Sequence, residues 1–89
     1  MENDSGESNH DSNDNLVRMA NQIGTFFASM PDRKEAIEGV ATHLKKFWDP
    51  RMRRSLLAKV DAAGAHDAGI SDIVASALQD YRAMLTPPA

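Results

Sequence analysis

The chain offers few side chains that could act as nucleophiles, acids, bases or metal ligands. It has no cysteine, which excludes disulfides, thiolate zinc sites, iron–sulfur ligation and a cysteine nucleophile. Its three histidines, His10, His43 and His66, never show the i, i+3 or i+4 spacing of a metal pair on one helix. No phosphate-binding glycine loop or nucleophile-elbow serine is present, and Asp32 with Glu35 fits a helix cap better than a catalytic dyad. We therefore expect no catalysis, no cofactor binding and no metal binding by this chain alone.

The most distinctive feature is the segment 47–54, which reads FWDPRMRR. It contains the only tryptophan, Trp48, and three of the ten Lys and Arg residues. Asp49 and Pro50 are typical of a helix start, but such a boundary needs neither a tryptophan nor a basic cluster beside it. Because Trp and Arg dominate protein interfaces, the segment favours a docking surface for an acidic or phosphate-bearing partner. An ordinary solvated basic face is the alternative.

Charge is unevenly distributed along the chain. Residues 1–15 carry five of the thirteen acids and no Lys or Arg, whereas residues 16–89 carry eight acids and all ten Lys and Arg residues. Six of these basic residues fall in the window 45–59, which has Asp49 as its single acid. Since the whole chain has a formal net charge of −3, nucleic-acid binding is the less favoured interpretation of the basic window.

The acidic residues 1–15 predict a disordered tail. This segment consists almost entirely of Asn, Asp, Ser, Glu and Gly, so it cannot bury enough apolar surface to offset the entropy of ordering. It would act as a solubilising tail, or as an electrostatic cover for the basic window. No apolar run approaches the roughly 18–20 residues that span a bilayer, and no signal-peptide pattern opens the sequence. We therefore expect a cytoplasmic protein with no membrane contact.

From Leu16 onward, apolar residues recur at the three-to-four spacing of amphipathic helices, and no stretch alternates with period two. Proline and glycine signals mark the expected helix ends, at Met30-Pro31, at the loop between Gly64 and Gly69, and at Thr86-Pro87-Pro88. The expected helix caps are Asp14 or Asn15, Asp32, Asp49 and Ser71. This pattern predicts an all-α fold, a compact bundle of about four short helices. Residues 16–86 form one domain between the tail 1–15 and a C-terminal end at 87–89.

The spacing also predicts which residues are buried. The first helix is expected to bury Leu16, Met19, Ala20, Ile23, Phe26 and Phe27. Phe47 and Trp48 are adjacent, so they point about 100° apart and only one of them can enter the core fully. Two glycines inside helices, Gly24 and Gly39, indicate either close helix crossings or a backbone site that a partner approaches.

Two stretches resemble the signatures of a known family. Residues 16–27, which read LVRMANQIG followed by T and FF, look like the opening signature of the delta subunit of NAD-dependent formate dehydrogenase. Residues 43–53, which read HL, two lysines and then FWDPRMR, are similar to the second and more distinctive signature of that family. The resemblance covers residues 16–85.

The resemblance implies a non-catalytic accessory subunit of a cytoplasmic complex that oxidises formate to carbon dioxide and reduces NAD. In such complexes the alpha subunit holds a bis-molybdopterin guanine dinucleotide centre with molybdenum or tungsten. Iron–sulfur clusters and FMN in the alpha, beta and gamma subunits carry the electrons to NAD. The delta chain holds no redox centre, and the resemblance implies that it stabilises the complex or assists cofactor insertion into alpha.

We expect two groups of partner-binding residues on this chain. The first group is Trp48, Arg51, Met52 and Arg53, and the second is Asn21 and Gln22. Arg51 and Arg53 would pair with carboxylates of the alpha subunit, or with a cofactor phosphate during insertion. Hydrogen bonding inside the domain is the alternative for both groups.

A free-standing helical adaptor or nucleic-acid-binding module is the competing functional class.

Overall fold

The computed structural model describes the backbone of residues 4–88 and the side chains of residues 15–88. Helices account for nearly all of this part, and no strand occurs in it, which confirms the all-α prediction. Four of the helices have nine residues or more, and two further helices have four residues each. Their bounds are α1 Asp4–Ala28, α2 Arg33–Phe47, α3 Pro50–Ala63, α4 Ala65–Ala68, α5 Asp72–Asp80 and α6 Arg82–Leu85.

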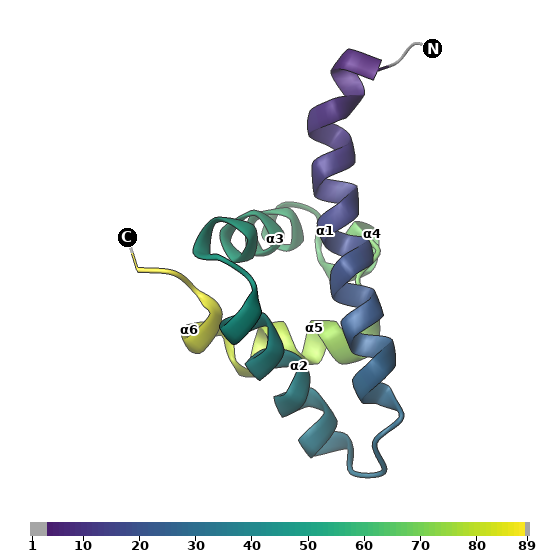
Figure 1. Ribbon diagram of the computed structural model, residues 1–89, viewed down its shortest axis with the longest axis vertical. Helices are drawn as coiled ribbons and strands as arrows, with labels where there is room; N and C mark the ends of the chain where they lie inside the picture. The colour runs from purple at the N-terminus through teal and green to yellow at the C-terminus, as the bar shows by residue number, and fades with distance from the viewer. Residues whose placement is uncertain (1–3, 89) are drawn as a thin grey trace.

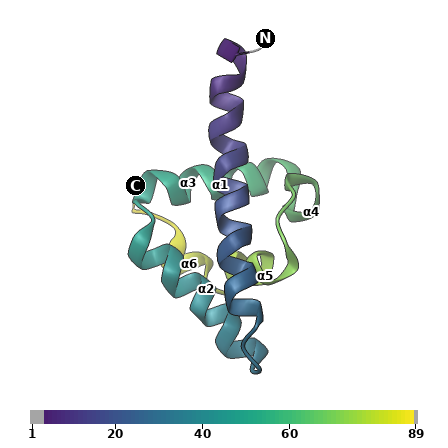
Figure 2. The same cartoon turned by 45° about the vertical axis from the view of Figure 1, so that its right-hand side comes forward.

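The helices enclose one core, with α1 along one side (Figure 1). After a tight turn, α2 runs back beside α1, and the two helices diverge away from that turn. The helix α5 packs against both α1 and α2, while α3 lies across α1 (Figure 2). The last helix, α6, packs on α2 and α5. The first turns of α1 project beyond the other helices in both views.

The start of α1 differs from the prediction. Its expected cap was Asp14 or Asn15, whereas the structure begins the helix at Asp4. Once a helix has formed, each residue added at its end gains a backbone hydrogen bond without a new nucleation step, which explains how it can extend into a polar sequence. Residues 1–3 and the side chains of residues 4–14 lie outside the described part, so the disorder of the segment 1–15 stays a prediction.

The caps of α2 and α3 are those that the sequence predicts. The Asp32 carboxylate accepts hydrogen bonds from the backbone N–H groups of Lys34 at 2.9 Å and Glu35 at 3.2 Å. The Asp49 carboxylate accepts one from Met52 N–H at 2.9 Å, with Pro50 in the first turn. Both acids therefore satisfy backbone donors that no intrahelical carbonyl can reach.

The C-terminal third is more broken than expected. The loop bracketed by the two glycines contains α4, and the expected last helix divides at Tyr81 into α5 and α6. This bend brings Leu85 into the core and places Arg82 against Asp61 of α3, with paired contacts of 2.9 and 2.7 Å. The Arg82 guanidinium holds the pKa of the Asp61 carboxyl below its usual value. Because the ion pair is exposed, we assign it a small share of the stability of the fold. Its role is to hold α6 against α3.

The predicted burial is confirmed in part, since Leu16, Ile23 and Phe27 of α1 pack half-buried against the core. Trp48 is buried at 5% exposure, whereas its neighbour Phe47 is 71% exposed. On α1, Ala20 is fully buried, but Phe26 is 71% and Met19 is 39% exposed, so the expected burial of these two was wrong. Phe26 is exposed for a geometric reason. The position of α1 that faces α5 lies two residues before Phe26, and a step of two residues turns the side chain by about 200°, away from α5.

Both internal glycines lie at close helix crossings. A Cβ at Gly24 would lie 2.7 Å from Cγ2 of Val74 and 2.9 Å from Cγ2 of Ile73, both on α5. A Cβ at Gly39 would lie 2.5 Å from Cδ1 of Phe27, where α2 faces α1. Such separations do not occur for real Cβ atoms, so an alanine at either position requires the facing side chain to shift.

We predict different costs for Gly24→Ala and Gly39→Ala. Val74 is fully buried and branched at Cβ, so it cannot move aside, and the overpacking at Gly24 should cost about 1–3 kcal/mol of unfolding free energy. The half-buried Phe27 ring can turn away from Gly39, and alanine gains about 1 kcal/mol of helix propensity, so that variant should lose less than about 1 kcal/mol. Urea unfolding measures both. Equal losses of unfolding free energy in the two variants would contradict the tight crossing assigned to Gly24.

Candidate docking cleft between α1 and α2

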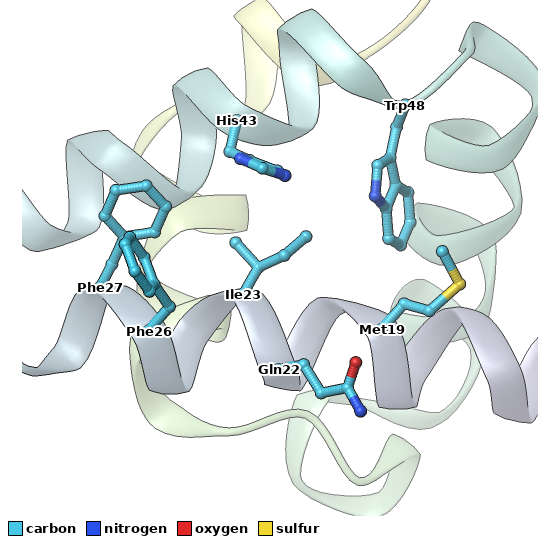
Figure 3. Close-up of a pocket in the computed structure, with 7 residues that line it drawn as sticks. All are labelled: Met19, Gln22, Ile23, Phe26, Phe27, His43 and Trp48. Atoms are coloured by element: carbon cyan, nitrogen blue, oxygen red, sulfur yellow. The ribbon is translucent and has the colours of Figure 1, made fainter.

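An open, largely apolar hollow of about 450 Å³ lies between α1 and α2 where the two helices diverge (Figure 3). His43 reaches into it from α2, and Trp48 reaches into it from the C-terminal cap of that helix. Ile23 points towards them from α1. We call this hollow the α1–α2 cleft. It is lined by Met19, Gln22, Ile23, Phe26, Phe27, His43 and Trp48.

Aromatic rings continue the cleft across both helices. Phe26 and Phe27 meet edge to face with centroids 5.0 Å apart, and the His43 ring lies 6.2 Å from Phe27 and 4.8 Å from Phe47. We call these four rings the aromatic row. His43 is half-buried between its neighbours, whereas both outer phenylalanines are largely exposed. Two exposed phenylalanines at the ends of one apolar strip are unusual on a surface that faces only water.

A second, smaller hollow adjoins the cleft at Met19. We call it the Arg51 notch, and it involves α1, the α2–α3 corner and the start of α3. Its two charged residues are Asp49, whose carboxylate caps α3, and Arg51. Arg51 is exposed, and Met52 beside it is half-buried. The residues of the notch are Asn15, Leu16, Met19, Asp49, Arg51, Met52 and Ser55.

The structure separates Arg53 from Arg51. Arg53 is only 6% exposed, and its Nη1 donates to the backbone carbonyl of Lys45 at 3.4 Å, near the C-terminus of α2. Its Nε has no hydrogen-bond partner, and no carboxylate pairs with it among the described side chains. A cation near the carbonyl end of a helix is favourable, and its stem adds buried contact area. Arg53 therefore serves the α2–α3 corner rather than the free surface.

Asn21 is likewise used inside the domain. Its side-chain N–H donates to the carbonyl of Gly69 at 2.8 Å, and its side-chain oxygen accepts from Ser71 N–H at 2.9 Å. It thus ties α1 to the turn between α4 and α5, which is the internal alternative that the sequence left open. Ser71 occupies the predicted N-cap position of α5, but its hydroxyl makes no cap hydrogen bond and has no described partner.

The expected partner-binding residues therefore fall into two environments. Gln22 and Arg51 are exposed and Met52 is half-buried, all beside the cleft or the notch. Trp48 is buried but forms part of the cleft wall, while Asn21 and Arg53 make contacts within the domain.

The sequence interpretation missed Phe26 as a surface residue. It predicted that one of Phe47 and Trp48 would stay out of the core, and the structure shows that this residue is Phe47.

The described residues contain no group of three or more His, Asp or Glu side chains that could hold a metal ion. None of the helices in the described part combines the length and apolar character needed to cross a bilayer. What this surface offers is an apolar cleft with one amide, one imidazole and a neighbouring guanidinium. Such a surface is suited to binding another protein.

The described residues form a small all-helical fold with an open apolar cleft between α1 and α2. The family model of the NADH-dependent formate dehydrogenase delta subunit, FdsD, matches residues 15–78, and the chain belongs to that family. The match includes both stretches on which the resemblance was noted and all residues of the cleft and the notch. No curated protein and no solved structure matches the chain.

We predict that Asn21→Ala destabilises the fold while Gln22→Ala does not. The first change leaves the backbone groups of Gly69 and Ser71 without their partners, which should cost about 1–3 kcal/mol of unfolding free energy. The second removes an exposed amide and should change that free energy by less than about 0.5 kcal/mol. Thermal and urea unfolding of the two variants provide the measurement. A stable Asn21→Ala variant would return this residue to the surface-contact role.

For the arginines, we predict that Arg53→Ala lowers the unfolding free energy by about 2–4 kcal/mol, because it leaves a cavity at the α2–α3 corner. Arg53→Met should recover most of this loss, since it refills the space without a buried charge. Arg51→Ala, at an exposed position, should stay within about 0.5 kcal/mol of the parent chain. Unfolding curves of all three variants test this order, and equal behaviour of the two alanine variants would refute the assignment.

Proposed function

We propose that this chain is a non-catalytic accessory subunit that docks on the catalytic alpha subunit of a cytoplasmic formate dehydrogenase and stabilises the assembled complex. The beta and gamma subunits complete that complex, which converts formate and NAD⁺ to carbon dioxide and NADH. The observation that carries the proposal is the α1–α2 cleft in a member of the delta-subunit family. An apolar surface of this kind gains stability when a partner covers it.

The chemistry of the chain supports a role without a redox centre of its own. The chain has no cysteine for an iron–sulfur cluster, and the described residues offer no metal-ligand cluster. In this proposal the molybdenum or tungsten centre, the iron–sulfur clusters, FMN and NAD belong to the other subunits. When bound there, they supply the oxidation of formate and the electron relay.

The proposed docking surface combines exposed residues that the sequence suggested with those that the structure adds. Arg51, Met52 and Gln22 remain in it, joined by Phe26 and Phe47. Trp48 contributes through the wall of the cleft, whereas Asn21 and Arg53 support the surface from inside. The burial of Arg53 also removes one cation from the surface on which a nucleic-acid-binding module would depend.

Assistance with molybdenum-cofactor insertion is the second form that an accessory role can take. The two forms differ in what is lost when the chain is absent. A stabilising subunit maintains the amount of assembled complex, because partner binding favours the folded, associated state. An insertion factor maintains the metal content of the catalytic subunit at a given amount of protein.

We predict that omitting this chain from co-expressed formate dehydrogenase subunits lowers the yield of assembled complex several-fold. The molybdenum or tungsten content per recovered catalytic subunit should change little. Size-exclusion chromatography with metal analysis of the complex peak measures both quantities, and restoring the chain serves as the control. An unchanged yield with lower metal content would replace stabilisation by insertion. If neither quantity changes and a tagged copy recovers no catalytic subunit, the accessory role itself is refuted.

A further inference from the structure

The α1–α2 cleft has the form of a helix-binding groove. Its two walls are helices that diverge from a shared turn (Figure 1), and the side chains between them line an open hollow of about 450 Å³ (Figure 3). The apolar lining comes from both walls and includes the exposed Phe26, and the exposed Phe47 extends it through ring contact with His43. An amphipathic helix lying in such a groove would bury these rings with its own apolar face, a common mode of peptide recognition.

Charged side chains lie at both ends of this surface. At the notch end, Arg51 is exposed and makes no ion pair among the described side chains, while the nearby Asp49 carboxylate caps α3. At the other end, Glu35 and Glu38 line a hollow that adjoins the aromatic row and contains Lys46 as its one cation. Neither acid has an ion-pair partner among the described side chains. A complementary occupant therefore carries an acid at the Arg51 end and a base at the Glu35 end.

The length of the groove limits the occupant. Twelve residues of α2 separate Glu35 from Phe47, which corresponds to about 18 Å along the helix axis. A helix of about three turns spans this distance and presents apolar side chains at i, i+3 or i+4, and i+7. The cleft volume of about 450 Å³ accommodates side chains of such a helix rather than a folded domain.

From these observations we infer that the α1–α2 cleft receives one amphipathic helix of the catalytic subunit, with an acid that pairs with Arg51 and a base that faces Glu35 and Glu38. This inference rests on the proposed accessory function and names the chemistry of its interface. Phe26 and Phe47 are the aromatic anchors, and His43 and Gln22 supply the polar contacts near the centre of the groove.

Site-specific photo-crosslinking in the assembled complex tests the inference. The changes are Phe26→p-benzoylphenylalanine and Phe47→p-benzoylphenylalanine, which keep an aromatic ring at two exposed positions. Ala62→p-benzoylphenylalanine, at an exposed position of α3 outside the cleft and the notch, is the control. We expect both cleft probes to join the same segment of the catalytic subunit, with apolar residues at helical spacing, and the Ala62 probe not to join it.

A charge exchange tests the polarity of the groove. Arg51→Glu should weaken association with the catalytic subunit by roughly tenfold, and reversing the acid in the crosslinked segment should restore it. Arg54→Glu makes the same charge change at an exposed position outside the notch and should have a much smaller effect.

The outcomes separate this inference from the function on which it rests. Crosslinks to a second copy of this chain would show that the cleft is a self-association surface, and crosslinks to a non-helical segment would exclude a helix as occupant. If the complex forms but the cleft probes join nothing, the docking surface lies elsewhere. Each of these results overturns the inference while the accessory role stands. Failure of the chain to associate with the catalytic subunit at all would refute the proposed function itself.

Discussion

The structure depends on how closely α1 approaches α5. At Gly24 the absence of a side chain lets the branched residues Val74 and Ile73 press against the α1 backbone. Asn21, one turn earlier, fixes the same helix to the turn between α4 and α5 through two backbone hydrogen bonds. On its other faces α1 meets α2 and α3, and α2 diverges from it away from the shared turn. The cleft lies where α1 and α2 separate.

The distinctive segment 47–54 combines several structural roles in one short stretch. Asp49 and Pro50 end one helix and start the next, while Trp48 and Arg53 fill the inside of the corner so that α2 and α3 keep their angle. Phe47 and Arg51 alternate with them and face outward. A motif that looked like one binding patch is therefore a rigid corner that presents an aromatic ring and a guanidinium on its outer side. Rigidity of this kind reduces the entropy lost on binding.

Local chemistry was readable from the sequence, and long-range geometry was not. The caps at Asp32 and Asp49 depend on residues two to four positions away, so spacing alone identified them. The role of Asn21 depends on a turn some fifty residues distant, which no local pattern reveals. No proline or glycine marks the division of the last helix at Tyr81. The bend coincides instead with the tertiary contacts of Leu85 and Arg82. For the same reason the apolar stripe of α1 could be detected, but not which part of it would remain exposed.

The exposed phenylalanines also bear on how a cell handles copies of this chain that have found no partner. A surplus copy presents Phe26, Phe47 and the cleft to the surrounding proteins, and such surfaces promote aggregation and recognition by chaperones and proteases. Opposing this, the first fifteen residues place five negative charges and no Lys or Arg on every copy. These acids give the whole chain its formal net charge of −3, and a net charge lowers the tendency of copies to associate. The chain thus combines an exposed apolar surface with an acidic N-terminal segment that opposes self-association.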